Sequence, residues 1–235
     1  MRGRCGWSVE REDDVLATAF RIPHDSPPKW LLVLTAYVDE SGIDQGGWMF
    51  VAGYVGDDTA WTKASHEWKA AIAPRKHLHM KELRMKERHR PLLEKAGAVP
   101  DKCGLTPILG GVRFEDYSDL IKGKRDEKLM AGYVVCCFAM LVNTLRGIPA
   151  DETLEIVFEQ QPIHGGNVSI ALAALHSVSM GELCLPNGTP KLSNWREVPK
   201  GVTVLTEIAD YYAYSLFQQW KDKRSFKSAL YVPPL

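Results

Sequence analysis

Four stretches of the chain have the hydrophobic pattern of β-strands. Residues 31–40 form an apolar, β-branched run that ends at a Ser-Gly turn, and residues 47–56 have the composition of its hairpin partner. Residues 105–114 predict a third strand, although Pro107 weakens it. Residues 153–161 alternate, which sends Leu154, Ile156 and Phe158 to one face and Glu155, Val157 and Glu159 to the other.

Apolar residues at helical spacing predict four helices. The first begins after N-cap candidates at 57–59 and continues to Pro74, the second spans 127–146, the third begins at Asn167, and the fourth spans 203–221. The second is apolar on nearly every side, so we expect it to be central. The fourth has an apolar stripe made of Leu205, Ile208, Ala209, Tyr212, Leu216 and Trp220.

The order of these elements predicts an α/β fold with a mixed sheet flanked by helices. The chain has 235 residues, a length suited to one domain. We expect residues 31–235 to form that domain. Residues 1–30 lack a clear period and end in breakers, so we expect an N-terminal extension.

Composition removes several classes of function. Lys plus Arg and Asp plus Glu number 29 each, so no whole-molecule field attracts nucleic acid or lipid. The longest apolar stretch, 130–142, is short of the about 20 residues of a membrane helix. Five cysteines without C-x-x-C spacing favour a reducing cytoplasm over a disulfide framework or zinc site, and the His77-x-His79 pair is a weak zinc signal.

Three acids, Asp39, Glu159 and Asp210, stand at strand ends or on an apolar helix. Strand ends at one sheet edge converge, and Mg²⁺ takes oxygen ligands from such carboxylates. The ordinary explanation, that strands end in charge where they reach water, is favoured for any one acid alone. Alternation separates Asp39 from Glu40, so we choose Asp39 as the ligand.

Asp210 lies away from the predicted stripe of its helix, where a solvated aspartate is normal. Ala213 and Phe217 lie near it on that side, however, so we expect Asp210 to be partly buried. A buried carboxylate requires a cation or strong donors.

The motifs AYVDESG (36–42), HLHMKEL (77–83), a late strand ending in an acid, and TEIADYYAY (206–214) occur in this order. Together they resemble the bacterial and phage family called domain of unknown function 3800, over about residues 31–220. That family is similar to the ribonuclease H-like superfamily. The resemblance implies a ribonuclease H-like fold with acids that bind Mg²⁺ or Mn²⁺ for phosphodiester cleavage.

The resemblance also implies roles for single residues. Asp39, as bridging ligand, with Glu159 and Asp210, would hold two cations about 4 Å apart. His79 would aid proton transfer, because the unperturbed pKa of histidine is near neutrality. Glu40, Ser41 and Glu82 would surround these ligands without binding the metal ions themselves. The family usually has aspartate where this chain has Glu159, which raises the alternative of a weakened or repurposed site.

Residues 75–90 are locally basic, and Arg75, Lys76, Lys81 and Arg84 are candidate phosphate contacts. A solvated loop is an equal alternative. The leading hypothesis is a metal-dependent nuclease acting on RNA or DNA. The main rival is a non-catalytic ribonuclease H-like module that binds nucleic acid or protein, and the third is an interaction subunit of a defence or mobile-element system.

Overall fold

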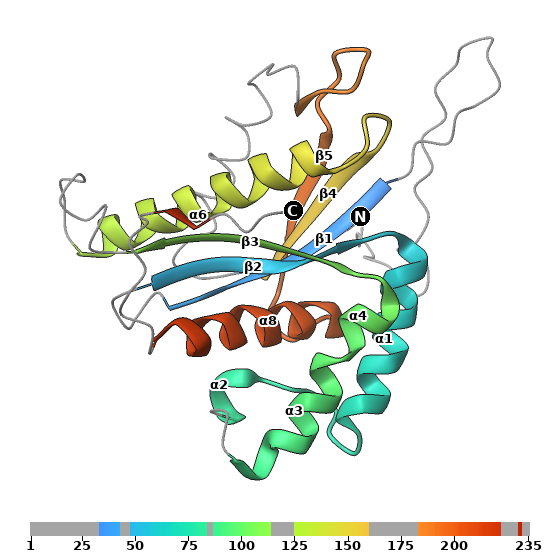
Figure 1. Cartoon of the computed structure of the whole chain (residues 1–235), viewed down its shortest axis with the longest axis vertical. Helices are drawn as coiled ribbons and strands as arrows, with labels where there is room; N and C mark the ends of the chain where they lie inside the picture. Colours follow the sequence, from blue (N-terminus) through green and yellow to red (C-terminus); the bar gives the residue numbers. More distant parts are fainter. Residues whose placement is uncertain are drawn as a thin grey trace, which may run out of the picture. The chain divides into compact units, whose positions relative to one another are not determined.

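The structure is a computed structural model that describes residues 33–42, 48–83, 87–113, 125–159, 183–221 and 230–231. Figure 1 shows one sheet with helices on both faces. The predicted N-terminal extension, 1–30, and the helix predicted from Asn167 lie outside these residues. In the part of the chain that is described, no helix is both long and apolar enough to cross a membrane.

The described sheet has six strands in the order β5-β4-β1-β2-β3-β6. β1 (Val33–Ser41), β2 (Trp48–Gly56) and β3 (Thr106–Arg113) are successive antiparallel neighbours. β4 (Thr153–Glu159) lies parallel to β1, β5 (Leu192–Val198) lies parallel to β4, and the short β6 (Leu230–Tyr231) pairs with β3. This mixed α/β sheet confirms the predicted fold class and is consistent with a ribonuclease H-like fold.

One face of the sheet is covered by α6 (Arg125–Gly147), as Figure 1 shows. The helix lies close to the sheet at Gly110, where any Cβ would overlap the backbone carbonyl of Cys136. The prediction that this helix is central was wrong. The helix packs on the sheet with one side only, and Val135 and Phe138 on its outer side are 39% and 47% exposed.

The opposite face carries α8 (Val204–Lys221) and α1 (Asp58–Ile72), both at predicted positions. The Asp57 carboxylate caps α1 by accepting the N–H of Ala60 at 2.7 Å. Between α1 and β3 the chain forms α2 (Met80–Leu83), the 3₁₀ helix η2 (Glu87–His89), α3 (Arg90–Gly97) and α4 (Val99–Cys103). These short helices extend the apolar layer beneath α8 and α1.

The buried side of α8 differs from the predicted stripe. Ile208, Ala209, Ala213 and Phe217 are at most 3% exposed, whereas Leu205, Tyr212 and Leu216 are only partly buried. Ala209 and Ala213 are small, so they let the helix approach the sheet closely and they lie on its buried side. The predicted stripe gave more weight to the larger apolar residues of the helix, which lie toward the margin of this contact. The strand β5 was not predicted.

Candidate active site

Two of the predicted acids lie side by side where parallel strands end. The last paired residues of β1 and β4 are Val38 and Phe158, so Asp39 and Glu159 are the next residue on each strand. Both are buried, at 5% and 7% exposure. Alternation from Tyr37 and Val157, which pack in the layer with α8, places the two carboxylates on the α8 face.

Asp39 is buried in the negative electrostatic field of three neighbouring acids. Burial raises its pKa well above the usual value, and the negative charges of Glu40, Asp210 and Glu159 raise it further. The hydrogen bond that its Oδ1 accepts from the Glu40 N–H, at 2.8 Å, acts in the opposite direction. The fold therefore brings Glu159 and Asp210 within electrostatic range of Asp39.

Glu40 lies at the same strand end and is half-buried. Burial raises its pKa to about 7, although a hydrogen bond with the Asp39 side chain lowers it. Burial raises the pKa of the Tyr133 hydroxyl on α6, and the charges of Glu40 and of Asp39 both act on this group and raise its pKa further. The Asp39 and Glu40 pair thus retains a proton near neutral pH. Ser41 ends β1 and is half-buried.

Glu159 is held between a hydroxyl and an ammonium group. Its Oε1 accepts a weak hydrogen bond from Thr206 Oγ1 at 3.4 Å, and its Oε2 lies 3.3 Å from Lys200 Nζ. Thr206 lies in the first turn of α8, and Lys200 follows β5. Thr206 Oγ1 also donates to the carbonyl of Thr203 at 2.9 Å, so its single proton is shared and Lys200 is the stronger partner of this carboxylate.

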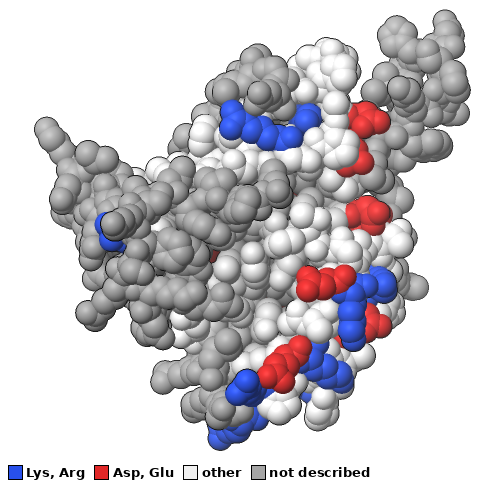
Figure 2. Space-filling model, in the orientation of Figure 1, with Lys and Arg blue, Asp and Glu red and all other residues white. Residues whose placement is uncertain are grey.

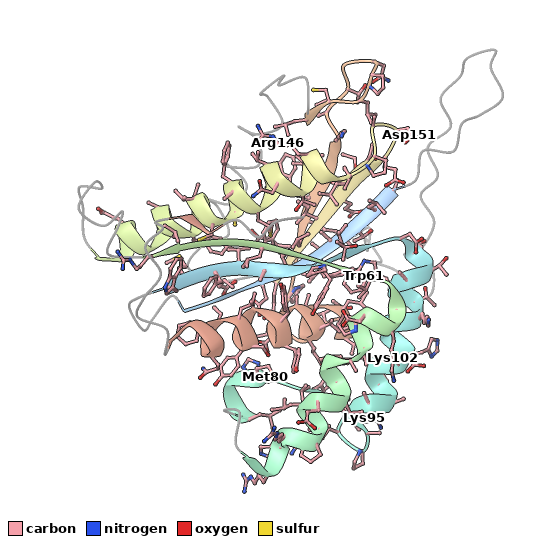
Figure 3. All side chains as sticks on the ribbon, viewed as in Figure 1. Trp61, Met80, Lys95, Lys102, Arg146 and Asp151 are labelled. Atoms are coloured by element: carbon pink, nitrogen blue, oxygen red, sulfur yellow. The ribbon has the colours of Figure 1, made fainter. Side chains whose placement is uncertain are left out.

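Asp210 is partly buried, as predicted, and contacts His79. Its Oδ2 lies 3.1 Å from His79 Nδ1 and accepts the backbone N–H of Met80 at 3.1 Å. A carboxylate is an acceptor, so Nδ1 of His79 carries the proton in this contact. Met80, labelled in Figure 3, lies where α2 approaches α8. The HLHMKEL segment therefore contacts the helix acid, a pairing that the order of the motifs along the chain did not predict.

Glu207 repeats this arrangement three residues earlier on α8. It accepts from His77 Nδ1 at 2.7 Å and from the backbone N–H of Leu78 at 3.1 Å. Trp68 Nε1 adds a third donor at 3.2 Å. Residues 77–80 are thus fixed to α8 by two matching units, each joining one histidine and the next N–H to one carboxylate.

The donor chemistry of the site suits a hard divalent cation. Asp39, Glu159 and Asp210 supply the carboxylate oxygens that Mg²⁺ and Mn²⁺ prefer. Among the described residues, no three His, Cys, Asp or Glu side chains are arranged to hold one metal ion. Glu159 and Asp210 are instead turned toward Lys200, His79 and backbone donors, so ligation requires these side chains to exchange partners.

The predicted phosphate contacts are described only in part. Arg75 and Lys76 are exposed just beyond α1. Lys81 and Glu82 lie in α2, but their side chains, like all of Arg84, are outside the described part of the structure. Figure 2 shows Lys and Arg interspersed with Asp and Glu over α1, α3 and α4 on the visible face.

Sequence patterns missed two charged residues of the site, Lys200 and Glu207. Glu207 lies three residues before Asp210, a spacing that places both acids on one helix face and was available as a signal. Lys200 follows a strand that was itself not predicted, so nothing in its surroundings indicated proximity to Glu159. A comparison of the chain with protein-family models and with curated proteins finds no match.

Proposed function

We propose that this protein is a nuclease that uses Mg²⁺ or Mn²⁺ to hydrolyse phosphodiester bonds of RNA or DNA. The observation that carries the proposal is Asp39, a buried carboxylate at a strand end in the fields of Glu159, Asp210 and Glu40. Negative charge gathered in a buried position is unfavourable unless a cation neutralises it. A divalent cation is the group that this arrangement best accommodates.

In this function, Asp39, Glu159 and Asp210 hold the cation. A bound divalent ion supplies Lewis acidity and a lowered pKa for an attacking water. Asp39 would be a ligand of this ion, because the charges of the other acids act on it. Glu159 and Asp210 approach from β4 and α8, so the site joins the sheet edge to the helix that covers it.

His79 is the group that moves a proton in this proposal. Its contact with Asp210 orients the imidazole and stabilises the protonated form while the proton resides on the ring. The contact also ties the orientation of Asp210 to the segment 77–80. His79→Gln should therefore reduce cleavage more than it reduces Mn²⁺ affinity.

Nucleic acid would reach the site past the exposed end of α1. Arg75 and Lys76 precede His79 by a few residues and are exposed there, which suits contacts to phosphates. The predicted contacts Lys81 and Arg84 belong to the same stretch of sequence. Such contacts would give affinity without base preference.

The test combines cleavage and metal binding. Purified protein is incubated with labelled single- and double-stranded RNA and DNA, with Mg²⁺ or Mn²⁺ and with chelator, while calorimetry measures Mn²⁺ affinity. Asp39→Asn should abolish metal-dependent cleavage and weaken Mn²⁺ binding at least about ten-fold. Unchanged cleavage by Asp39→Asn would exclude the proposed role of this residue.

A non-catalytic binding module is the second candidate. It is favoured by the engagement of Glu159 with Lys200 and Thr206 and by the lack of an assembled ligand group among the described residues. This candidate predicts no Mn²⁺ heat in calorimetry and nucleic-acid binding that persists in chelator.

A further inference from the structure

Lys200 is placed rigidly beside the acids by a tight turn. The N–H of Val202 bonds to the carbonyl of Pro199 at 3.2 Å, and Gly201 has φ +73. A positive φ at the third position is what a type II turn requires, and glycine adopts it without strain. Because Val198 pairs with Glu159 across β5 and β4, this turn holds Lys200 next to that carboxylate.

The charge of Lys200 acts on the whole acid group. Its Nζ lies 3.3 Å from Glu159 Oε2. Partial burial lowers the pKa of Lys200, but the charges of Glu159, Asp39 and Asp210 outweigh this effect and raise it. The ammonium is therefore a positive group within range of the same acids that a metal ion would use.

The ion pair has little value for stability alone. The Lys200 side chain is 56% exposed, and a pair open to solvent on one side contributes at most about 1 kcal/mol. The same exposure leaves the ammonium within reach of a molecule that arrives from solution. A compact ammonium on a flexible stem is well suited to bind a phosphate as a point charge.

We propose that the Lys200 ammonium has two alternative partners. It pairs with Glu159 in the metal-free protein, and it contacts a phosphate of the nucleic acid once a divalent ion is bound by the acids. A cation bound to Glu159 removes the partner of Lys200 and repels its ammonium toward solvent. The substrate backbone then supplies the negative charge that Glu159 no longer offers. This inference rests on the proposed metal-dependent function.

The test uses Lys200→Met, which retains most of the side-chain volume and removes the charge. Without its competing ammonium, the variant should bind Mn²⁺ about five-fold more tightly than wild type in calorimetry without nucleic acid. With Ca²⁺ in place of Mg²⁺, it should bind labelled DNA and RNA strands more weakly, with a salt dependence reduced by about one phosphate contact.

Two further variants control the result. Lys200→Arg keeps the charge, so its Mn²⁺ affinity and its nucleic-acid binding should both be close to those of the wild type. Lys102→Met removes one exposed charge from α4, where Lys102 lies beside Lys63 and Cys103, and should leave both quantities unchanged. Thermal melting in chelator verifies that each variant is folded.

The outcomes separate this inference from the function on which it rests. If wild-type protein gives no Mn²⁺ heat, the metal-dependent function fails. If wild-type protein binds Mn²⁺ but Lys200→Met shows an unchanged Mn²⁺ affinity or an unchanged salt slope, the role of Lys200 is overturned and the metal site stands.

Discussion

The two faces of the sheet bury charged groups in different ways. On the α6 face, Lys191 is 5% exposed, and its ammonium donates to the carbonyls of Leu145 and Ile148 at 3.1 and 3.0 Å. These carbonyls lie at the C-terminal end of α6, where the helix dipole also favours a cation. The surrounding layer is apolar. This buried charge is satisfied by the fold itself.

On the α8 face, the buried acids divide into two kinds. Glu207 accepts from three donors, so it resembles Lys191 as a satisfied group that fastens one segment to another. Asp39 instead lies among acids whose charges raise its pKa. Buried carboxylates with raised pKa values lower the folding stability, and such groups are concentrated at binding and catalytic sites.

The largest effect on stability is expected at Lys191, the charged group buried on the α6 face. Lys191→Met should lower the free energy of unfolding by about 3 kcal/mol, because two buried carbonyls at the end of α6 lose their donor. Urea denaturation of the metal-free protein measures this change. The exposed Lys102→Met should change it by less than about 0.5 kcal/mol. A loss below about 1 kcal/mol at Lys191 would contradict its structural role.

Glu207 tests whether a satisfied acid behaves like the satisfied lysine. Glu207→Ala should destabilise the protein by about 2 kcal/mol, since Trp68 Nε1 and the Leu78 N–H lose a buried acceptor. His77→Ala is the matched control, because that side chain is 70% exposed and its loss leaves the buried donors paired. Equal destabilisation by both variants in urea would show that the ion pair, and not the buried acceptor, is what matters.

The pH dependence of stability tests the unfavourable acids. Glu40 has a pKa of about 7 in the fold against about 4.3 in the unfolded chain, so between these values the native state holds a proton that the unfolded state has released. Stability must then fall as pH rises through this range, by about 1.5 kcal/mol after allowance for partial exposure. Urea titrations in chelator at pH 5 and pH 8 measure it, and Glu40→Gln should flatten the difference. A fall in Glu40→Gln as large as that of the wild type would refute the assignment.

The smallest expected change is a gain. Asp39→Asn should raise the stability of the metal-free protein at pH 8 by about 1 kcal/mol, because it removes one charge from the acid group. Urea denaturation in chelator gives the value, and added Mn²⁺ should stabilise wild type but not the variant. Destabilisation by Asp39→Asn in chelator would place Asp39 with the structural charges instead.

The sequence predicted those elements whose burial follows a regular period. The alternation of β4 is confirmed, and so is the helical spacing that predicted α1: the apolar residues at this spacing, Trp61, Ala64, Trp68, Ala71 and Ile72, are all buried. The strand β5 was missed because it is an edge strand in which Ser193, Asn194 and Arg196 are exposed, so it has too little apolar content to be recognised.

The sequence named the acids of the candidate site and His79, but not how these residues are held. Asp39 and Glu159 follow from where parallel strands end, and their proximity requires knowledge that β1 and β4 are neighbours. The partners of these acids depend on tertiary contacts. Lys200 reaches Glu159 through β5, and Glu207 meets residues 77 and 78 from more than a hundred positions away, which no local pattern records.

The matched units at residues 77–80 also limit how this stretch can change in length. Inserting or deleting one residue between His77 and His79 would leave either Glu207 or Asp210 without its histidine and N–H pair. Residues 73–76, all exposed, can absorb such a change without disturbing either carboxylate. Sequences that diverge from this one should therefore vary in length before His77 and keep fixed spacing after it.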